Sequence, residues 1–128
     1  MTRRGLVSAG IVLATSLLTI ILLAAGGQKL LGTQEMITVF DQIGIGQWFR
    51  WFTGLWEVTA AALLMDERSR LAGIAMAGAL CVGALVAHSV IGGSFVPAFM
   101  LLAITSLIAW SDRYVGELPL KTAGVRNA

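Results

Sequence analysis

Residues 5–27 read GLVSAGIVLATSLLTIILLAAGG and contain no charged side chain. An α-helix rises about 1.5 Å per residue, so roughly 20 such residues cross the hydrocarbon core of a bilayer, which is about 30 Å thick. This stretch therefore predicts a membrane-spanning helix. A cleaved signal peptide is the competing interpretation, but its apolar region is only about 7–15 residues long, shorter than this stretch.

Three further apolar stretches follow along the chain, at about residues 48–65, 71–91 and 95–110. Arg50 and Glu57 lie in the second predicted span, and His88 lies in the third. Four spans leave no room for a second domain in a chain of 128 residues. We therefore predict an all-α fold in which residues 1–128 form a single integral membrane domain, built as a four-helix bundle.

The composition is typical of a chain solvated by lipid. Hydrophobic residues make up 57% of it and charged residues only 12%, against about 25% charged residues in an average soluble domain. The apolar content excludes a disordered chain, and the single cysteine, Cys81, excludes a disulfide-stabilised secreted domain. The basic residues are scattered rather than gathered into a patch, so we expect no nucleic-acid partner.

The distribution of basic residues predicts the orientation. With four crossings, one side of the membrane receives Arg3, Arg4, Arg68, Arg70, Arg113, Lys121 and Arg126. Only Lys29 and Arg50 fall at or near the other side. Basic residues favour the cytoplasmic side, so we predict that both termini are cytoplasmic. Aromatic residues typical of membrane interfaces agree, with Trp48, Trp51 and Trp56 at the outer side and Trp110 and Tyr114 at the inner side.

The longest connection, residues 28–47, contains apolar residues at a spacing of three to four, namely Met36, Ile37, Phe40 and Ile43. Thr33 precedes them as a candidate N-cap, and Gly44 and Gly46 follow as terminators. The pattern predicts a short amphipathic helix on the outer face, between the first and second spans. We expect it to cover the ends of the bundle rather than to bind a partner.

Small residues recur every four positions in the third predicted span, at Ala75, Ala79, Gly83 and Ala87. Helices in lipid associate through close van der Waals approach, which small residues permit. We expect this stripe to pack inside the bundle rather than to form the seam of a homodimer.

Three ionisable residues fall in the outer half of the predicted spans: Lys29, Glu57 and His88. Facing lipid would cost each of them about 2.5–3.5 kcal/mol, so they should turn into the bundle and find partners. Helical spacing places Arg50, Thr53 and Glu57 on one stripe of the second span. We predict that Glu57 pairs with Lys29 or with Arg50, and that His88 lies nearby.

This predicted cluster has two interpretations. It is either an ion-pair network that fixes the register of the helices without chemistry, or a polar pocket that opens toward the outer leaflet. Such a pocket would bind the head group of a quinone or a lipid, with Glu57 or His88 exchanging protons.

Counting residues excludes several chemistries. One cysteine cannot cycle through an internal disulfide, and one histidine cannot provide both axial ligands of a haem. No Cys, His and acid cluster has metal-ligand spacing, and neither GxxxxGK nor GxSxG occurs. We expect no haem, flavin or metal site, and no enzyme that acts on its own.

The order of these features resembles the DoxX-like family of small four-helix membrane proteins, over about residues 6–108. The motifs that carry the resemblance are Ala25-Gly26-Gly27-Gln28-Lys29-Leu30, Gly54-Leu55-Trp56-Glu57-Val58, Ala60-Ala61-Ala62-Leu63-Leu64 and the small-residue span leading to His88. Some relatives are associated with membrane redox systems, including a thiosulfate:quinone oxidoreductase subunit and a mycobacterial complex that contains superoxide dismutase and a sulfurtransferase. The positions that match the family's polar pattern are Lys29, Glu57 and His88. The lack of a second cysteine departs from relatives associated with thiol chemistry.

The resemblance and the polar cluster together imply a subunit or accessory protein of a quinone-linked redox assembly in a bacterial plasma (inner) membrane. Its partners would then be membrane lipid, another membrane or periplasmic protein, and a quinone. An assembly protein, anchor or chaperone for a partner protein is the alternative. A small-molecule transporter is a weaker one, because the sequence has no inverted repeat and no broken mid-membrane helix.

Overall fold

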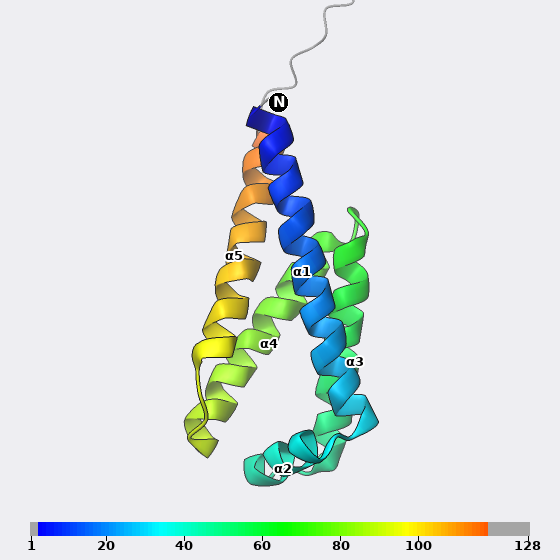
Figure 1. Cartoon of the computed structure of the whole chain (residues 1–128), viewed down its shortest axis with the longest axis vertical. Coiled ribbons are helices and arrows are strands. Elements are labelled where there is room, and N and C mark those ends of the chain that lie inside the picture. The colour runs from blue at the N-terminus through cyan, green and yellow to red at the C-terminus, as the bar shows by residue number, and fades with distance from the viewer. Residues whose placement is uncertain (1–2, 118–128) are drawn as a thin grey trace, which may run out of the picture.

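The computed structural model describes residues 3–117, which form five helices and no strand: α1 (Arg3–Leu31), α2 (Gln34–Ile43), α3 (Gln47–Met65), α4 (Arg70–Ile91) and α5 (Val96–Glu117) (Figure 1). The prediction of an all-α fold is confirmed. The four long helices run alternately in opposite directions, and the short α2 lies at the end where α1 finishes and α3 begins. The start of α1 and the end of α5 lie together at the opposite end.

Among residues 3–117, three helices are long and apolar enough to cross a membrane: Gly5–Leu31, Arg70–Ile91 and Val96–Tyr114. The predicted span over residues 48–65 forms a helix, α3, but is not among these three. The two charged residues of this helix, Arg50 and Glu57, are buried between helices. The structure thus supports three of the four predicted apolar spans.

Helix α5 covers nearly all of the predicted span over residues 95–110 and continues beyond it to Glu117. A helix that leaves the hydrocarbon core needs no further apolar residues, so hydropathy alone could not mark its end.

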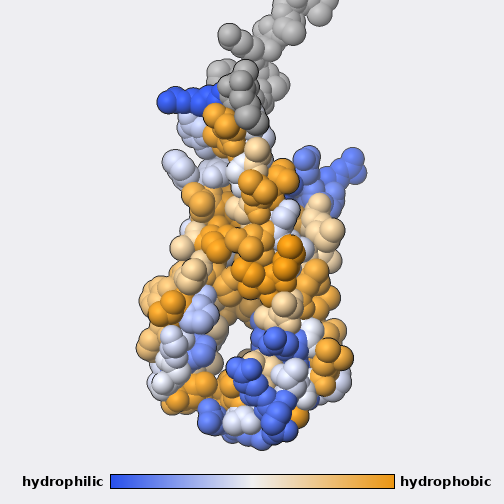
Figure 2. All heavy atoms as spheres, viewed as in Figure 1, coloured by the Kyte–Doolittle hydropathy of each residue, from blue (hydrophilic) through white to orange (hydrophobic). Residues whose placement is uncertain are grey.

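The surface of the long helices is rich in large apolar side chains. Leu13, Leu71 and Val90 are each more than two-thirds exposed, at 72%, 73% and 71%. Figure 2 shows a broad hydrophobic area over the middle of the molecule. Water would not solvate such a surface favourably, whereas lipid tails do. The chain is therefore a multi-pass membrane protein.

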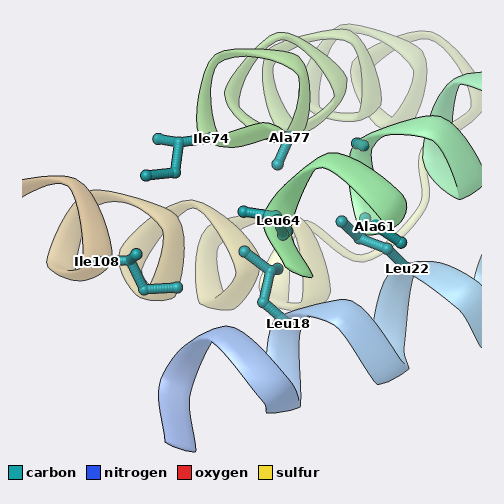
Figure 3. Close-up of a cluster of buried hydrophobic side chains, with 8 residues drawn as sticks. Leu18, Leu22, Ala61, Leu64, Ile74, Ala77 and Ile108 are labelled. Atoms are coloured by element: carbon teal, nitrogen blue, oxygen red, sulfur yellow. The ribbon is translucent and has the colours of Figure 1, made fainter. Parts of the chain in front are cut away.

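The core lies where the four long helices meet (Figure 3). It consists of Leu18 and Leu22 from α1, Ala60, Ala61 and Leu64 from α3, Ile74 and Ala77 from α4, and Ile108 from α5. Two glycines bring backbones close together at the helix crossings. A Cβ atom on Gly26 would come within 2.9 Å of the Gly54 carbonyl oxygen, and one on Gly73 within 2.9 Å of the Leu64 nitrogen.

The small-residue stripe that the sequence predicts to pack inside the bundle lies mostly on the exposed side of α4. Ala75, Ala79 and Gly83 are exposed, whereas Gly73, Ala77 and Cys81 are the buried small residues of this helix. Small residues occur on two neighbouring stripes of α4, and spacing alone does not reveal which stripe meets the bundle. The prediction that this stripe packs inside the bundle is therefore wrong for Ala75, Ala79 and Gly83, while Ala87 is half-buried.

The corner between α1 and α2 is built on Gly32, whose φ of 68° suits a residue without a side chain. The Gly32 nitrogen donates to the Lys29 carbonyl and the Thr33 nitrogen to the Gln28 carbonyl, the pair of bonds that ends many helices. Helix α2 follows as predicted and ends at Gly44, while its N-cap residue, Thr33, makes no side-chain capping bond. Phe40 is the buried residue of α2 and packs edge-on against Phe49 of α3, with ring centroids 5.9 Å apart.

Candidate functional site

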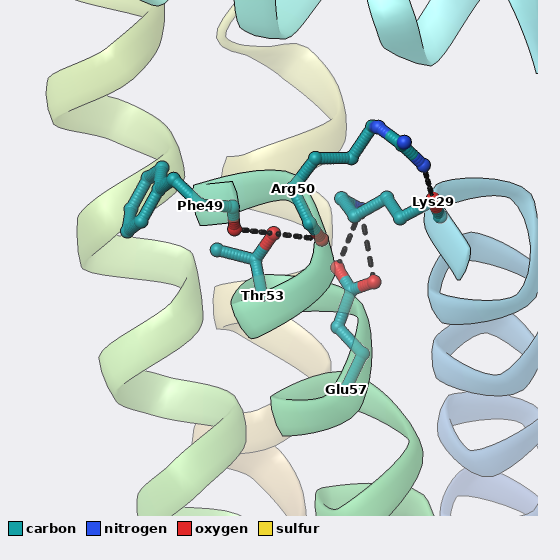
Figure 4. Close-up of polar contacts among 5 residues, drawn as sticks. All are labelled: Lys29, Phe49, Arg50, Thr53 and Glu57. Atoms are coloured by element: carbon teal, nitrogen blue, oxygen red, sulfur yellow. Dashed lines mark hydrogen bonds and ion pairs between the residues drawn. The ribbon is translucent and has the colours of Figure 1, made fainter. Parts of the chain in front are cut away.

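Lys29 and Glu57 form an ion pair between the last turn of α1 and the middle of α3 (Figure 4). The Lys29 Nζ atom donates hydrogen bonds to both carboxylate oxygens of Glu57, at 2.8 Å to Oε1 and 2.9 Å to Oε2. Only 15% of the Lys29 side chain and 5% of the Glu57 side chain are exposed. Of the two partners that the sequence allowed for Glu57, the structure selects Lys29.

Arg50 has a different role from the one predicted. Its guanidinium donates from one Nη atom to the backbone carbonyl of Lys29, and its Nε atom donates to the Gln47 Oε1 atom at 2.6 Å. The Lys29 carbonyl belongs to the last turn of α1, where carbonyls lack helical partners and the helix dipole favours a cation. Gly32 leaves room for this cap, because a Cβ atom there would lie 3.3 Å from the guanidinium.

Gln47 extends the network to α2. Its Nε2 atom donates to the Ile37 carbonyl at 3.0 Å and to the Asp41 Oδ1 atom at 2.7 Å. The sequence analysis missed Gln47 and Asp41. The signal that could have found Gln47 is its position three residues before Arg50, which places both side chains on one face of a helix. Lys29, Glu57, Arg50 and Gln47, here called the polar clamp, thus join α1, α2 and α3.

Thr53 forms no hydrogen bond with the Lys29–Glu57 ion pair, although helical spacing places it on the same stripe of α3 as Glu57. Its Oγ1 atom bonds to the carbonyls of Phe49 and Arg50 in its own helix, at 3.0 and 3.1 Å (Figure 4). A threonine hydroxyl in a helix commonly finds such a local acceptor. Thr53 is therefore satisfied within α3 and adds no donor to the polar clamp.

His88 stands apart from the polar clamp. Within residues 3–117 it forms neither a hydrogen bond nor an ion pair with Lys29 or Glu57; its ring contacts Phe95 instead, edge-on at 6.5 Å. The Nδ1 atom is buried without a partner among these residues and lies against Gly93, where a Cβ atom would collide with it. The ring is half-buried, and its Nε2 atom is not enclosed in this way.

The course of α4 explains this separation. Helix α4 contacts α3 closely where Gly73 meets Leu64, then diverges and ends beside the start of α5 (Figure 1). Figure 2 shows an opening between this diverging part of α4 and the end of the molecule that contains α2, with hydrophilic atoms along its border. We call this opening the α2-side cleft. The sequence could place His88 near the end of its helix but could not give the angle between α3 and α4.

A row of aromatic rings follows one face of α3. Phe49 stacks on Phe52 with centroids 6.2 Å apart, and Phe52 contacts Trp56 at 5.7 Å. The Trp56 Nε1 atom donates to the Met76 carbonyl of α4 at 3.0 Å, so this tryptophan joins two helices. This bond places the Trp56 end of the aromatic row against α4.

Metal-ligating side chains are not grouped in the part of the chain that the structure describes. No group of three His, Cys, Asp or Glu residues could hold a metal ion there. Cys81 is a buried free thiol on the packed face of α4.

Comparison with known proteins identifies a family but no individual relative. Neither a curated protein nor a solved structure matches the chain. The model of the DoxX-like family matches residues 13–111, a range that begins within α1, ends within α5 and includes Lys29, Arg50, Glu57 and His88. The chain belongs to the DoxX-like family.

Proposed function

We propose that α3 is the fourth membrane span and that the end carrying α2 faces outward from a bacterial plasma membrane. Burial of Arg50 and Glu57 removes the main obstacle to placing α3 in lipid. The common position of both described chain ends fits an even number of crossings. The excess of basic residues at that end favours its cytoplasmic location.

We further propose that the protein is an accessory subunit of a quinone-linked redox assembly, and that the α2-side cleft receives the quinone head group. The observation that carries this proposal is the opening itself, an interruption of the bundle with hydrophilic atoms at its border. Ligand sites in helical proteins commonly lie between helices, with apolar walls and a few polar groups. The aromatic row of α3 and the inward stripe of α4 would provide those apolar walls.

His88 is the polar group best suited to hold such a head group. It continues the stripe of Ala77 and Cys81, which are buried, beyond the point where α4 leaves the core. The Nδ1 atom is enclosed against Gly93 without a partner, so a ligand can reach only the Nε2 side of the ring, where one tautomer presents an N–H. That N–H would donate a hydrogen bond to a quinone carbonyl.

The polar clamp has a supporting role in this proposal. Both oxygens of Glu57 are held by Lys29, so Glu57 is not available for proton exchange with a ligand. The clamp instead fixes α1, α2 and α3 as one rigid wall of the cleft. A preformed wall reduces the ordering that a ligand must induce.

Titration of the purified protein with a short-chain ubiquinone analogue in mild detergent tests the proposal. His88→Ala should raise the Kd about tenfold, the effect of losing one good hydrogen bond in a shielded site. His88→Gln retains an N–H donor and should recover part of the affinity. Ser89→Ala is the matched control, because the Ser89 hydroxyl bonds only to the Leu85 carbonyl of its own helix. Equal affinity in all four proteins would reject the head-group site.

A protein that anchors or assembles a partner is the second candidate. Two observations favour it. The polar groups of the polar clamp form their hydrogen bonds within the chain, and the small residues Ala75, Ala79 and Gly83 of α4 are exposed on the surface of the bundle. Gentle purification separates the two candidates. A stoichiometric partner protein without quinone would support assembly, whereas quinone that is lost in His88→Ala would support the redox role.

A further inference from the structure

A groove of about 500 Å³ runs between α1 and α5, at the end of the molecule where the two described chain ends lie. Its polar and aromatic lining residues, Arg3, Trp110, Ser111 and Tyr114, come from the terminal turns of the two helices. Toward the middle of the molecule the lining becomes apolar, with Val7, Ile11 and Ala14 on α1 and Leu107 and Ile108 on α5. The groove therefore changes from polar to apolar along its length, as a phospholipid does.

The dimensions of the groove match one leaflet of a bilayer. Ala14 lies eleven positions after Arg3, which corresponds to about 16 Å along a helix. Half of the hydrocarbon core is about 15 Å. An acyl chain lying along the groove would thus run from the interface to the middle of the membrane.

The charge at the mouth of the groove selects the head group. Arg3 is exposed, is the one charged residue among the described lining residues, and has no ion-pair partner within residues 3–117. A guanidinium binds a phosphate through two parallel hydrogen bonds. Trp110 and Tyr114 stack with ring centroids 6.0 Å apart and are 66% and 41% exposed, as aromatic residues at head-group level are.

We propose that the α1–α5 groove binds one anionic phospholipid, with its phosphate on Arg3 and an acyl chain along the apolar lining. Gly10 is part of the lining, and a Cβ atom there would meet nothing within 4 Å. Packing within the chain therefore does not explain the glycine, whereas space for an acyl chain does. The site lies at the opposite end from the α2-side cleft and is independent of quinone binding.

Native mass spectrometry of the full chain, released from detergent after exposure to phosphatidylglycerol or phosphatidylcholine, tests this site. Wild-type protein should retain one phosphatidylglycerol in preference to phosphatidylcholine. Gly10→Leu should abolish retention, because the new side chain fills the groove without a clash. Gly78→Leu is the matched control: its Cβ would also meet nothing within 4 Å, but Gly78 does not line the groove.

Arg3→Gln separates head-group recognition from acyl-chain binding. It should lower the preference for phosphatidylglycerol about fivefold, the contribution of one basic residue near an anionic membrane surface. Equal retention in Gly10→Leu and Gly78→Leu would overturn the proposal. So would a wild-type chain that binds no lipid, the result expected if residues 118–128 of the same chain fill the groove.

Discussion

At the scale of single residues, the bond between Lys29 and Glu57 determines how the end of the bundle that carries α2 is held together. Glu57→Gln would leave a buried ammonium group without its counter-charge. Breaking a buried pair in this way costs about 3–5 kcal/mol of unfolding free energy. Denaturant unfolding of the two proteins in the same detergent, followed by circular dichroism, measures the loss.

The double variant Lys29→Met with Glu57→Gln provides the control for this prediction. It removes the buried charge as well as the pair, so it should recover much of the lost stability. If the single and double variants unfold at the same denaturant concentration, the ion pair is not what holds α1 to α3.

The sequence predicts this pair because solvation in lipid turns both side chains inward at the same depth. It does not predict the partners of Arg50. Those depend on where α1 ends, at Gly32, and on the reach of a long side chain to one particular carbonyl. The sequence also does not predict the distance of His88 from this ion pair. That distance depends on the direction in which α4 leaves the core, and a pattern of hydrophobic residues does not give this direction.

At the scale of helices, the contact between α1 and α3 depends on adjacent glycines with opposite surroundings. A Cβ on Gly26 would come within 2.9 Å of the Gly54 carbonyl oxygen, whereas one on Gly27 would meet nothing within 4 Å. Gly26→Ala should therefore force the helices apart and cost about 1–3 kcal/mol. Gly27→Ala should stabilise α1 by about 0.5–1 kcal/mol, because alanine loses less entropy in a helix.

Thermal unfolding of both glycine variants in one detergent compares them directly. The expected result is a lower midpoint for Gly26→Ala and an unchanged or higher midpoint for Gly27→Ala. Equal shifts in the same direction would mean that helix propensity, rather than the close approach of α1 to α3, determines the effect.

Sequence patterns predict the positions of the helices but not which face of each helix is buried. The apolar runs located α1, α4 and α5, and the period of three to four in residues 28–47 located α2. Such patterns do not predict the rotation of α4 about its axis, because Ala75 and Ala77 are equally small while only Ala77 is buried. The packing partner chooses between the two stripes, and the partner is not part of the local sequence.

At the scale of the whole molecule, the proposed four crossings predict which connections face each side of the membrane. In a Cys81→Ala background, we expect Gln42→Cys in α2 and Ser94→Cys in the α4–α5 connection to react with a membrane-impermeant maleimide added to intact cells. Glu67→Cys, between α3 and α4, should react only after the membrane is opened. All three positions are exposed in the structure, so a lack of labelling reports the membrane and not burial.

This pattern depends on α3, the long helix that is not among the three apolar enough to cross a membrane. If α3 stayed outside the membrane, Glu67→Cys would label together with Gln42→Cys, and only three crossings would remain. The two described chain ends would then belong on opposite sides of the bilayer, although the fold brings them to the same end. Labelling of Glu67→Cys in intact cells would therefore contradict both the fourth span and the wall that α3 is proposed to provide for the α2-side cleft.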